Sequence, residues 1–302
     1  MCVLFTSVRP LERAENLKTV FDAYDGEKQY VQRDYTHPID GMHSGRYRLV
    51  VTDGLMDDTP GKYIWIGHGM GAGKTVGKHH PWSPFRRSDI VTYAIASSED
   101  MVEDVAGFLG VPKSKVIPLG MPRTDAYFRM KQKPHEGRKH LYAPTFRGGM
   151  WMPDFNMLWR TMPEGHELTV KLHMVTGNKV TSRWPNIKVA SAHVPSTPYL
   201  VNTDTVITDY SSIMFDAMVL RKPVILFAKD KENYLRERGM YYEYPGAYSE
   251  YYAETEQELA GLLDEAEWTD EAEAAREYFC GACDGHSTER MVGLIKEVLC
   301  GS

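Results

Sequence analysis

The segment from Val206 to Phe227 restricts the possible folds of this chain more than any other. It reads Val-Ile-Thr-Asp-Tyr-Ser-Ser-Ile-Met-Phe-Asp-Ala-Met-Val-Leu-Arg-Lys-Pro-Val-Ile-Leu-Phe. Two short apolar runs flank a polar turn and a helical stretch, a pattern typical of a buried strand, a turn, a helix and a second buried strand. Strands connected through a helix run parallel in one sheet, so the segment predicts an α/β fold.

The same alternation of short apolar runs and helical patterns continues along the rest of the chain. In the first half we expect strands at 3–6, 47–52, 63–66, 91–96 and 115–118, and helices at 10–23 and 98–109. In the second half we expect strands at 140–143, 168–172, 187–189, 205–207 and 224–227. Helices are expected there at 154–162, 211–220, 256–265, 271–278 and 288–299, with Thr255 and Glu258 forming a capping box. The pattern favours mostly parallel sheets built from βαβ units.

A polar, charged segment at 128–139 separates the two halves and is the best linker candidate. We therefore predict an N-terminal Rossmann-like domain at 1–126 and a C-terminal one at 127–302, whose last helix is free to pack back on the first domain. In such sheets, ligands bind beyond the carboxyl ends of the strands. The two domains are expected to face one cleft.

Composition limits the class of protein. The 302 residues are 42% hydrophobic and 25% charged, which is typical of a soluble globular protein, and the net charge of −6 argues against a dominant nucleic-acid surface. No apolar run reaches the roughly 18 to 20 residues of a membrane-spanning helix, and the first residues do not resemble a signal peptide. With only four cysteines, we expect a cytoplasmic protein.

Two short motifs suggest a metal site and a nucleotide-hydrolysing P-loop, but each matches its pattern incompletely. Cys280 and Cys283 form a single CxxC pair with His286 nearby, which is too little for a four-ligand zinc site. The glycine-rich stretch that ends in Lys74 resembles a phosphate-binding P-loop, but His68 stands where that motif requires its first glycine. A P-loop kinase would hydrolyse ATP in a manner that depends on Lys74.

What remains of that stretch is a glycine-rich loop after a strand. Its glycines allow the backbone to approach a ligand closely. A histidine titrates near neutral pH, so His68 is suited to act as a general base. The alternative, a turn with a solvent-facing histidine, stays open from the residues alone.

Polar residues follow three expected strands of the second half. Thr145 and Arg147 follow the first, and Lys171 and His173 stand at the end of the second, two positions apart on one face. Arginine has the fork geometry that suits phosphate. Because the carboxyl ends of parallel strands meet at one edge, these residues are expected to converge on one ligand.

The third strand leads into the polar turn of the opening segment. Ser211 and Ser212 supply hydroxyls beside free backbone N–H groups at the start of a helix, which together can hold phosphate. Asp209 is placed to cap the helix, and Asp216 either reaches a ribose or faces solvent. The turn alone predicts a general anion site.

Taken together, these motifs resemble the CDP-glycerol glycerophosphotransferase family of teichoic-acid enzymes. The motifs, in order, are His68-Gly69 with Lys74, Gly120-Met-Pro-Arg-Thr-Asp125, Tyr142-Ala-Pro-Thr-Phe-Arg147, Lys171-Leu-His173, Thr208 to Asp216 and, near the end, Asp284 to Arg290. The loop after Gly69 departs from the family pattern, and Met174 stands where the family has proline.

The resemblance implies a GT-B-type pair of domains and transfer of glycerol phosphate, or a related polyol phosphate, from its CDP derivative to an acceptor hydroxyl with release of CMP. It implies catalytic roles for His68 and His173. Donor and pyrophosphate binding would fall to Thr145, Arg147, Lys171, Asp209, Ser211, Ser212 and Asp216. Acceptor contacts would come from Gly69, Lys74, Arg123 and Asp125.

The expected partners are a CDP-polyol donor and a hydroxyl on a glycan or polyol-phosphate chain, with or without a lipid. No cofactor, metal or nucleic acid is expected, and the protein is placed in the cytoplasm, with peripheral binding at the inner face of the membrane as a variant. Two alternatives stay open: a GT-B glycosyltransferase that uses a nucleotide sugar, and a non-catalytic protein that binds a nucleotide.

Overall fold

The computed structural model describes residues 2–33, 47–54, 62–67, 90–145, 152–173, 183–191 and 193–301. The chain divides into two compact units, which are considered separately. The first consists of Met1–Phe128 together with Glu277–Ser302, and the second of Arg129–Arg276. The chain thus returns to its first unit at the end.

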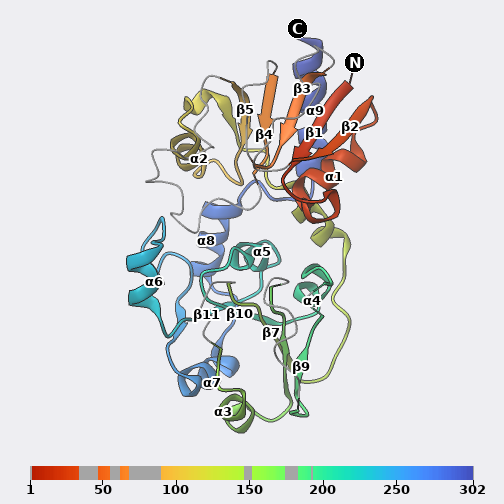
Figure 1. Ribbon diagram of the computed structural model, residues 1–302. Helices are drawn as coiled ribbons and strands as arrows, with labels where there is room; N and C mark the ends of the chain where they lie inside the picture. Colours follow the sequence, from red (N-terminus) through yellow and green to blue (C-terminus); the bar gives the residue numbers. More distant parts are fainter. Residues whose placement is uncertain are drawn as a thin grey trace. The chain divides into compact units, whose positions relative to one another are not determined.

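The first unit contains a parallel sheet (Figure 1). Among the described residues it has six strands in the order β2-β1-β3-β4-β5-β6. The strands are β1 (Cys2–Ser7), β2 (Lys28–Gln32), β3 (Tyr47–Thr52), β4 (Lys62–Trp65), β5 (Val91–Ile95) and β6 (Val116–Ile117). Every residue of β1 is buried, as expected for a central strand of a sheet covered on both faces.

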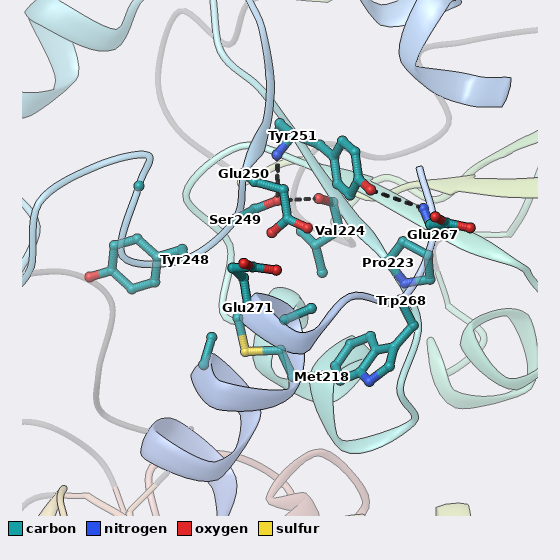
Figure 2. A pocket seen from close by; sticks show the side chains of 13 residues that line it. Met218, Pro223, Val224, Tyr248, Ser249, Glu250, Tyr251, Glu267, Trp268 and Glu271 are labelled. Atoms are coloured by element: carbon teal, nitrogen blue, oxygen red, sulfur yellow. Dashed lines mark hydrogen bonds between the residues drawn. The ribbon is translucent and has the colours of Figure 1, made fainter. Parts of the chain in front are cut away.

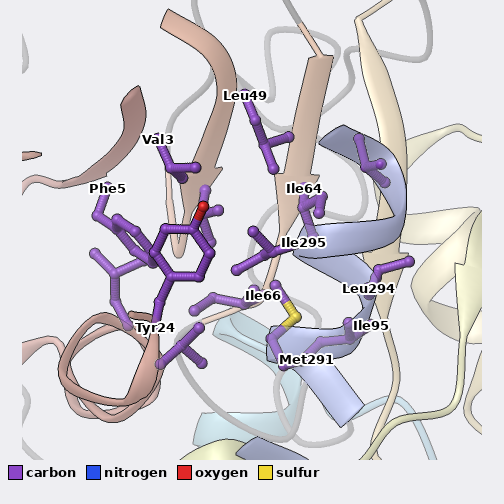
Figure 3. Packing of buried hydrophobic residues seen from close by; sticks show 14 of the residues in the cluster. Val3, Phe5, Tyr24, Leu49, Ile64, Ile66, Ile95, Met291, Leu294 and Ile295 are labelled. Atoms are coloured by element: carbon purple, nitrogen blue, oxygen red, sulfur yellow. The ribbon is translucent and has the colours of Figure 1, made fainter. Parts of the chain in front are cut away.

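Helices from both ends of the unit's sequence cover this sheet. They are η1 (Leu11–Arg13), α1 (Glu15–Ala23), α2 (Val102–Leu109), η3 (Lys113–Lys115), η4 (Pro122–Arg129) and α9 (Ser287–Cys300). In the core, Met291 and Ile295 of α9 pack with Ile64 of β4, and all three side chains are fully buried (Figure 3). The last helix of the chain therefore completes the core of the first unit.

The second unit contains another parallel sheet, with six strands in the described part of the chain. Their order is β12-β11-β10-β7-β8-β9. The strands are β7 (Arg138–Tyr142), β8 (His166–Val170), β9 (Ile187–Val189), β10 (Thr205–Thr208), β11 (Val224–Phe227) and β12 (Tyr251–Ala253). The helices are α3 (Phe155–Thr161), α4 (Thr197–Val201), α5 (Ile213–Val219), α6 (Lys231–Glu237), α7 (Glu256–Glu265) and the larger part of α8 (Asp270–Cys280), whose last residues belong to the first unit.

The apolar side chains of this sheet pack against the helices α3 and α7. Ile207 of β10 and Ile225 of β11 lie in one buried cluster with Leu158 of α3 and Leu259 of α7. This cluster fixes the positions of β7, β10 and β11, and with them the loops that follow these strands.

The predicted α/β fold with parallel sheets is confirmed, and so is the capping box at Thr255 and Glu258. Strands β2 and β12 were not predicted. Both lie at the edge of a sheet, where a strand needs only one neighbour and less apolar surface. Helix α5 begins at Ile213, two residues later than expected.

Candidate functional site

The second sheet reverses its strand order between β7 and β10. From β7 the chain continues to β8 and β9 on one side, whereas β10, β11 and β12 lie on the other. Such a reversal opens a crevice beyond the carboxyl ends of the two strands, because their connections leave in opposite directions. Any ligand of this sheet is therefore expected at the ends of β7 and β10.

The segments that follow these two strands are hydrogen-bonded to each other. Asp209, which follows β10, is buried, and its Oδ1 accepts from the backbone N–H of Thr145 at 2.7 Å and of Tyr210 at 2.6 Å. The hydroxyl of Thr208 donates to the carbonyl of Ala143 at 2.7 Å. The expected role of Asp209 as a cap is thus replaced by one that joins the two strand ends.

The two serines occupy the turn between β10 and α5. Ser212 is exposed and stands at the N-cap of the helix, yet its side chain makes no capping hydrogen bond. The oxygen of the Ser211 side chain accepts a long hydrogen bond of 3.5 Å from the backbone N–H of Ile213. Asp216 lies inside α5 and is buried, so it does not face solvent.

Residues after β7 and β8 place a hydroxyl and a cation beyond the carboxyl ends of these strands. Thr145 is 8% exposed, and its hydroxyl has no hydrogen-bond partner among the residues described. Lys171 is also buried, and burial lowers the pKa of its ammonium group. Its Nζ donates to the carbonyl of Leu172 at 3.4 Å, while His173 is exposed. A buried hydroxyl and a buried ammonium group suit an anionic ligand.

Aromatic residues that the sequence did not single out for the site support the turn. The ring of Tyr210 is stacked on Tyr234 of α6, with centroids 3.6 Å apart and planes at 4°, and its hydroxyl donates to Asp230 at 3.0 Å. The hydroxyl of Tyr244 donates to the backbone carbonyl of Asp209 at 3.3 Å. Tyr244 comes from the tyrosine-rich stretch at 241–252, whose composition was the only sequence signal for this role.

Two residues expected to contact the acceptor have contacts within the first unit. The carboxylate of Asp125 is buried and accepts from the backbone N–H groups of Ser287 at 3.1 Å and Thr288 at 2.7 Å. It therefore caps the start of α9, and the expected acceptor contact stays a prediction. The backbone N–H of Arg123 donates to the side chain of Asn16, and its guanidinium lies 3.4 Å from Glu15.

The end of the chain is attached to the same region by Arg290. Its guanidinium donates to the carbonyl of Leu119 at 2.9 Å and pairs with Asp284 at 2.8 Å. Gly120 has a φ of +79°, and a Cβ there would approach the carbonyl oxygen of Ala282 to 2.3 Å. The motifs at 120–125 and 284–290 therefore hold α9 against the rest of the first unit.

Four expected site residues, His68, Gly69, Lys74 and Arg147, lie outside the described residues. The residue before His68 is described. The carbonyl of Gly67 accepts from the side-chain amide of Asn16 at 3.3 Å, and Gly67 itself has a φ of +64°. No pattern in the sequence pointed to Asn16, because its partner is 51 positions away.

A cavity of about 130 Å³ lies at the amino ends of the strands of the second sheet, near the starts of β11 and β12. It is therefore on the side opposite the expected site residues. Glu250, Glu271 and Trp268 are among the residues that line it, and Figure 2 shows the first two pointing toward one another. None of the expected site residues lines this cavity. Its volume is below the roughly 300 Å³ of typical ligand pockets.

The CxxC pair lies at the end of α8 and in the segment before α9, and its nearby histidine lies just before α9. Cys280 and Cys283 are both buried, while His286 is exposed. Within the described ranges, no three His, Cys, Asp or Glu side chains are arranged to hold a metal ion. No helix there has the length and apolarity to cross a membrane.

The two parallel sheets define a doubly wound α/β protein. The polar residues beyond the carboxyl ends of β7, β8 and β10 are suited to bind an anion. Residues 15–297 match the model of the CDP-Glycerol:Poly(glycerophosphate) glycerophosphotransferase family, and the chain belongs to this family. The predicted resemblance is confirmed.

Curated relatives include teichoic-acid enzymes. The chain is 28% identical over 263 residues to a teichoic acid poly(ribitol-phosphate) polymerase of Bacillus spizizenii, covering 77% of this chain and 42% of the relative. It is 30% identical over 172 residues to a teichoic acid glycerol-phosphate primase of Bacillus subtilis, covering 49% and 42%. The chain thus spans less than half the length of these relatives.

Among solved structures, the wall teichoic acid polymerase TagF has a similar fold. The TM-score is 0.78 at 18% sequence identity, and the alignment covers 98% of this chain and 88% of that one. At this identity the similarity concerns the fold.

Proposed function

We propose that this chain transfers glycerol phosphate, or a related polyol phosphate, from its CDP derivative to an acceptor hydroxyl and releases CMP. Membership of the family supports the proposal, and so do the names of relatives that polymerise or prime polyol-phosphate chains. The proposal includes a GT-B-type arrangement, in which the second unit binds the donor and the first supplies the acceptor side.

The observation that carries the donor assignment is the reversal of strand order between β7 and β10, with polar residues beyond the ends of both strands. The link between Thr145 and Asp209 holds the two strand ends together, so the neighbouring hydroxyls keep fixed positions. Thr145, whose hydroxyl has no partner among the described residues, and the buried Lys171 follow β7 and β8, and Ser212 follows β10, so all three lie beyond the carboxyl ends of this sheet. Preorganised donors of this kind suit the pyrophosphate of a CDP-polyol.

The reaction requires one proton transfer and one substitution at phosphorus. His68 takes the proton of the acceptor hydroxyl as its oxygen forms a bond to the β-phosphorus. The bond from that phosphorus to the bridging oxygen breaks, its electron pair stays with CMP, and the product is a phosphodiester. Arg147, Lys171 and His173 stabilise the charge that accumulates as CMP leaves.

The remaining residues would bind the two substrates. Ser211 and Ser212 hold the pyrophosphate, and Asp216 positions the ribose. Gly69 and Lys74 contact the acceptor.

The direct test is nucleotide release by the purified protein. CDP-glycerol, CDP-ribitol and a panel of UDP-sugars are each incubated with glycerol-phosphate oligomers as acceptors, and the released nucleotide is quantified. Release of CMP that depends on the acceptor is expected. Release of UDP alone would instead assign a glycosyltransferase, and binding of CDP-glycerol without turnover under any acceptor would assign a non-catalytic protein.

Substitution of the two histidines tests the mechanism. His68→Ala is expected to lower turnover by about 10²- to 10⁴-fold, the usual loss when a general base is removed. His173→Ala is expected to lower it by roughly 10²- to 10³-fold, as for a residue that stabilises transition-state charge. His193→Ala, at an exposed histidine of the second unit, is the control.

CMP release by His68→Ala at the wild-type rate would refute the assignment of the base. The proposed transfer needs no metal ion, so activity is expected to be fully retained in chelator. Loss of activity that magnesium restores would contradict this part of the proposal.

A further inference from the structure

The first sheet also reverses its strand order, between β1 and β3. The chain passes from β1 to β2 on one side, whereas β3 and β4 lie on the other. The rule that places a ligand beyond such a reversal therefore applies to this sheet as well. Ser7 and Arg9 are at the end of β1, and Asp53 follows β3 directly.

Arg9 is held at this point by contacts to its backbone and to its side chain. Its N–H donates to the side-chain oxygen of Ser7 at 3.1 Å, and its carbonyl accepts from the hydroxyl of Tyr30. Its guanidinium lies 3.8 Å from the carboxylate of Asp53. The arginine side chain is 38% exposed, whereas that of Asp53 is 1% exposed.

The groups that hold Arg9 come at a cost to the fold. Burial raises the pKa of Asp53, and a hydrogen bond from Ser7 and the charge of Arg9 act in the opposite direction. Burial also raises the pKa of Tyr30 to about 12, so its hydroxyl stays protonated and can donate to the carbonyl of Arg9. An arginine at the surface needs no such support, and fixing its side chain costs rotamer entropy. An arginine whose backbone is anchored, whose guanidinium lies beside a buried carboxylate and which is partly exposed suits a binding site.

We propose that Arg9 binds a phosphate group of the acceptor, an inference that rests on the transfer reaction proposed above. The guanidinium offers two parallel N–H donors that match the oxygens of a phosphate. Asp53 acts through Arg9 as a positioning residue. The site belongs to the first unit, separate from the residues assigned to the donor.

The strand that leads toward the segment of the proposed base belongs to the same sheet. Strand β4, which ends just before Gly67 and His68, is two strands away from β1, or roughly 10 Å at the usual spacing. The acceptor class that fits has a phosphate near its reacting hydroxyl, as in a polyol-phosphate chain. A neutral glycan lacks this group.

The test compares Arg9→Gln with Arg13→Gln, which removes the same charge from an exposed arginine four positions along the chain. Binding of glycerol-phosphate oligomers is measured by calorimetry, and kinetics with CDP-glycerol give the acceptor KM, kcat and donor affinity. For Arg9→Gln we expect about 10-fold weaker oligomer binding and a similar rise in acceptor KM, with kcat and donor affinity unchanged. Arg13→Gln is expected to match the wild type.

Arg9→Lys keeps a cation beside Asp53 and is expected to fold normally while recovering only part of the affinity. Wild-type oligomer binding by Arg9→Gln, or a loss confined to donor affinity, overturns the inference. The calorimetric measurement needs no turnover, so it decides on Arg9 even if no CMP is released. In that event the proposed transfer fails separately.

Discussion

At the scale of single residues, the hydroxyl of Thr145 is expected to contribute to ligand binding but not to the stability of the fold. It is buried without a partner among the described residues, so the folded protein gains little from it. Thr145→Val is expected to leave the melting temperature unchanged or slightly raised. If the hydroxyl donates to the pyrophosphate, CDP-glycerol affinity should fall about 10-fold. Thermal unfolding and donor titration of the same preparation measure both effects.

Thr205 provides the matched control for this prediction. Its hydroxyl is also buried and without a partner among the described residues. Thr205 is the first residue of β10, however, so it lies at the amino ends of the strands, away from the expected site. Thr205→Val should therefore keep full donor affinity. Equal donor affinities in the two variants and the wild type would exclude Thr145 from the site.

At the scale of elements, the carboxylate of Asp125 determines how α9 begins. It accepts two backbone N–H groups that would otherwise be buried without partners. Asp125→Ala is expected to lower the free energy of unfolding of the first unit by about 2 kcal/mol, the upper range for a lost cap. Denaturant unfolding measures this loss, and donor affinity should be unchanged because the cap lies in the other unit.

The control for the cap is Glu289→Ala, which removes an acid that is 83% exposed from the first turn of the same helix. Its effect should be within about 0.5 kcal/mol. If Asp125→Ala kept full stability and lost acceptor affinity instead, the contact role implied by the family resemblance would be correct and the capping role unimportant.

The elements also show how far the sequence could predict this structure. The runs at β10 and β11 are short, rich in β-branched and apolar residues, and fully buried, which is typical of interior strands, so they were recognised. The residues that converge at the ends of β7, β8 and β10 followed from parallel pairing alone. The role of Asp125 could not be predicted, because its partners lie more than 160 positions away and no local pattern encodes such a contact.

At the scale of the whole molecule, acid is expected to destabilise the second unit first. His140 and His166 lie on β7 and β8 with ring nitrogens 3.0 Å apart, and both are buried. Burial, and then the charge of His166, lower the pKa of His140 to about 3. Burial also lowers the pKa of His166, against the opposing charge of Asp264.

The direction in which stability changes with pH follows from which state, folded or unfolded, binds more protons. Below about pH 6.5 the unfolded chain binds protons that the folded pair rejects, so stability is full above this pH and falls as the pH decreases towards 3. His140 alone contributes a slope of up to about 1.4 kcal/mol per pH unit in this window. Denaturant unfolding at pH 7.5, 6, 5 and 4, followed by a probe in the second unit, measures the slope. His140→Leu should flatten it, whereas His193→Gln, at an exposed histidine of the same unit, should not. An equally steep slope in His140→Leu would mean that other groups cause the acid sensitivity.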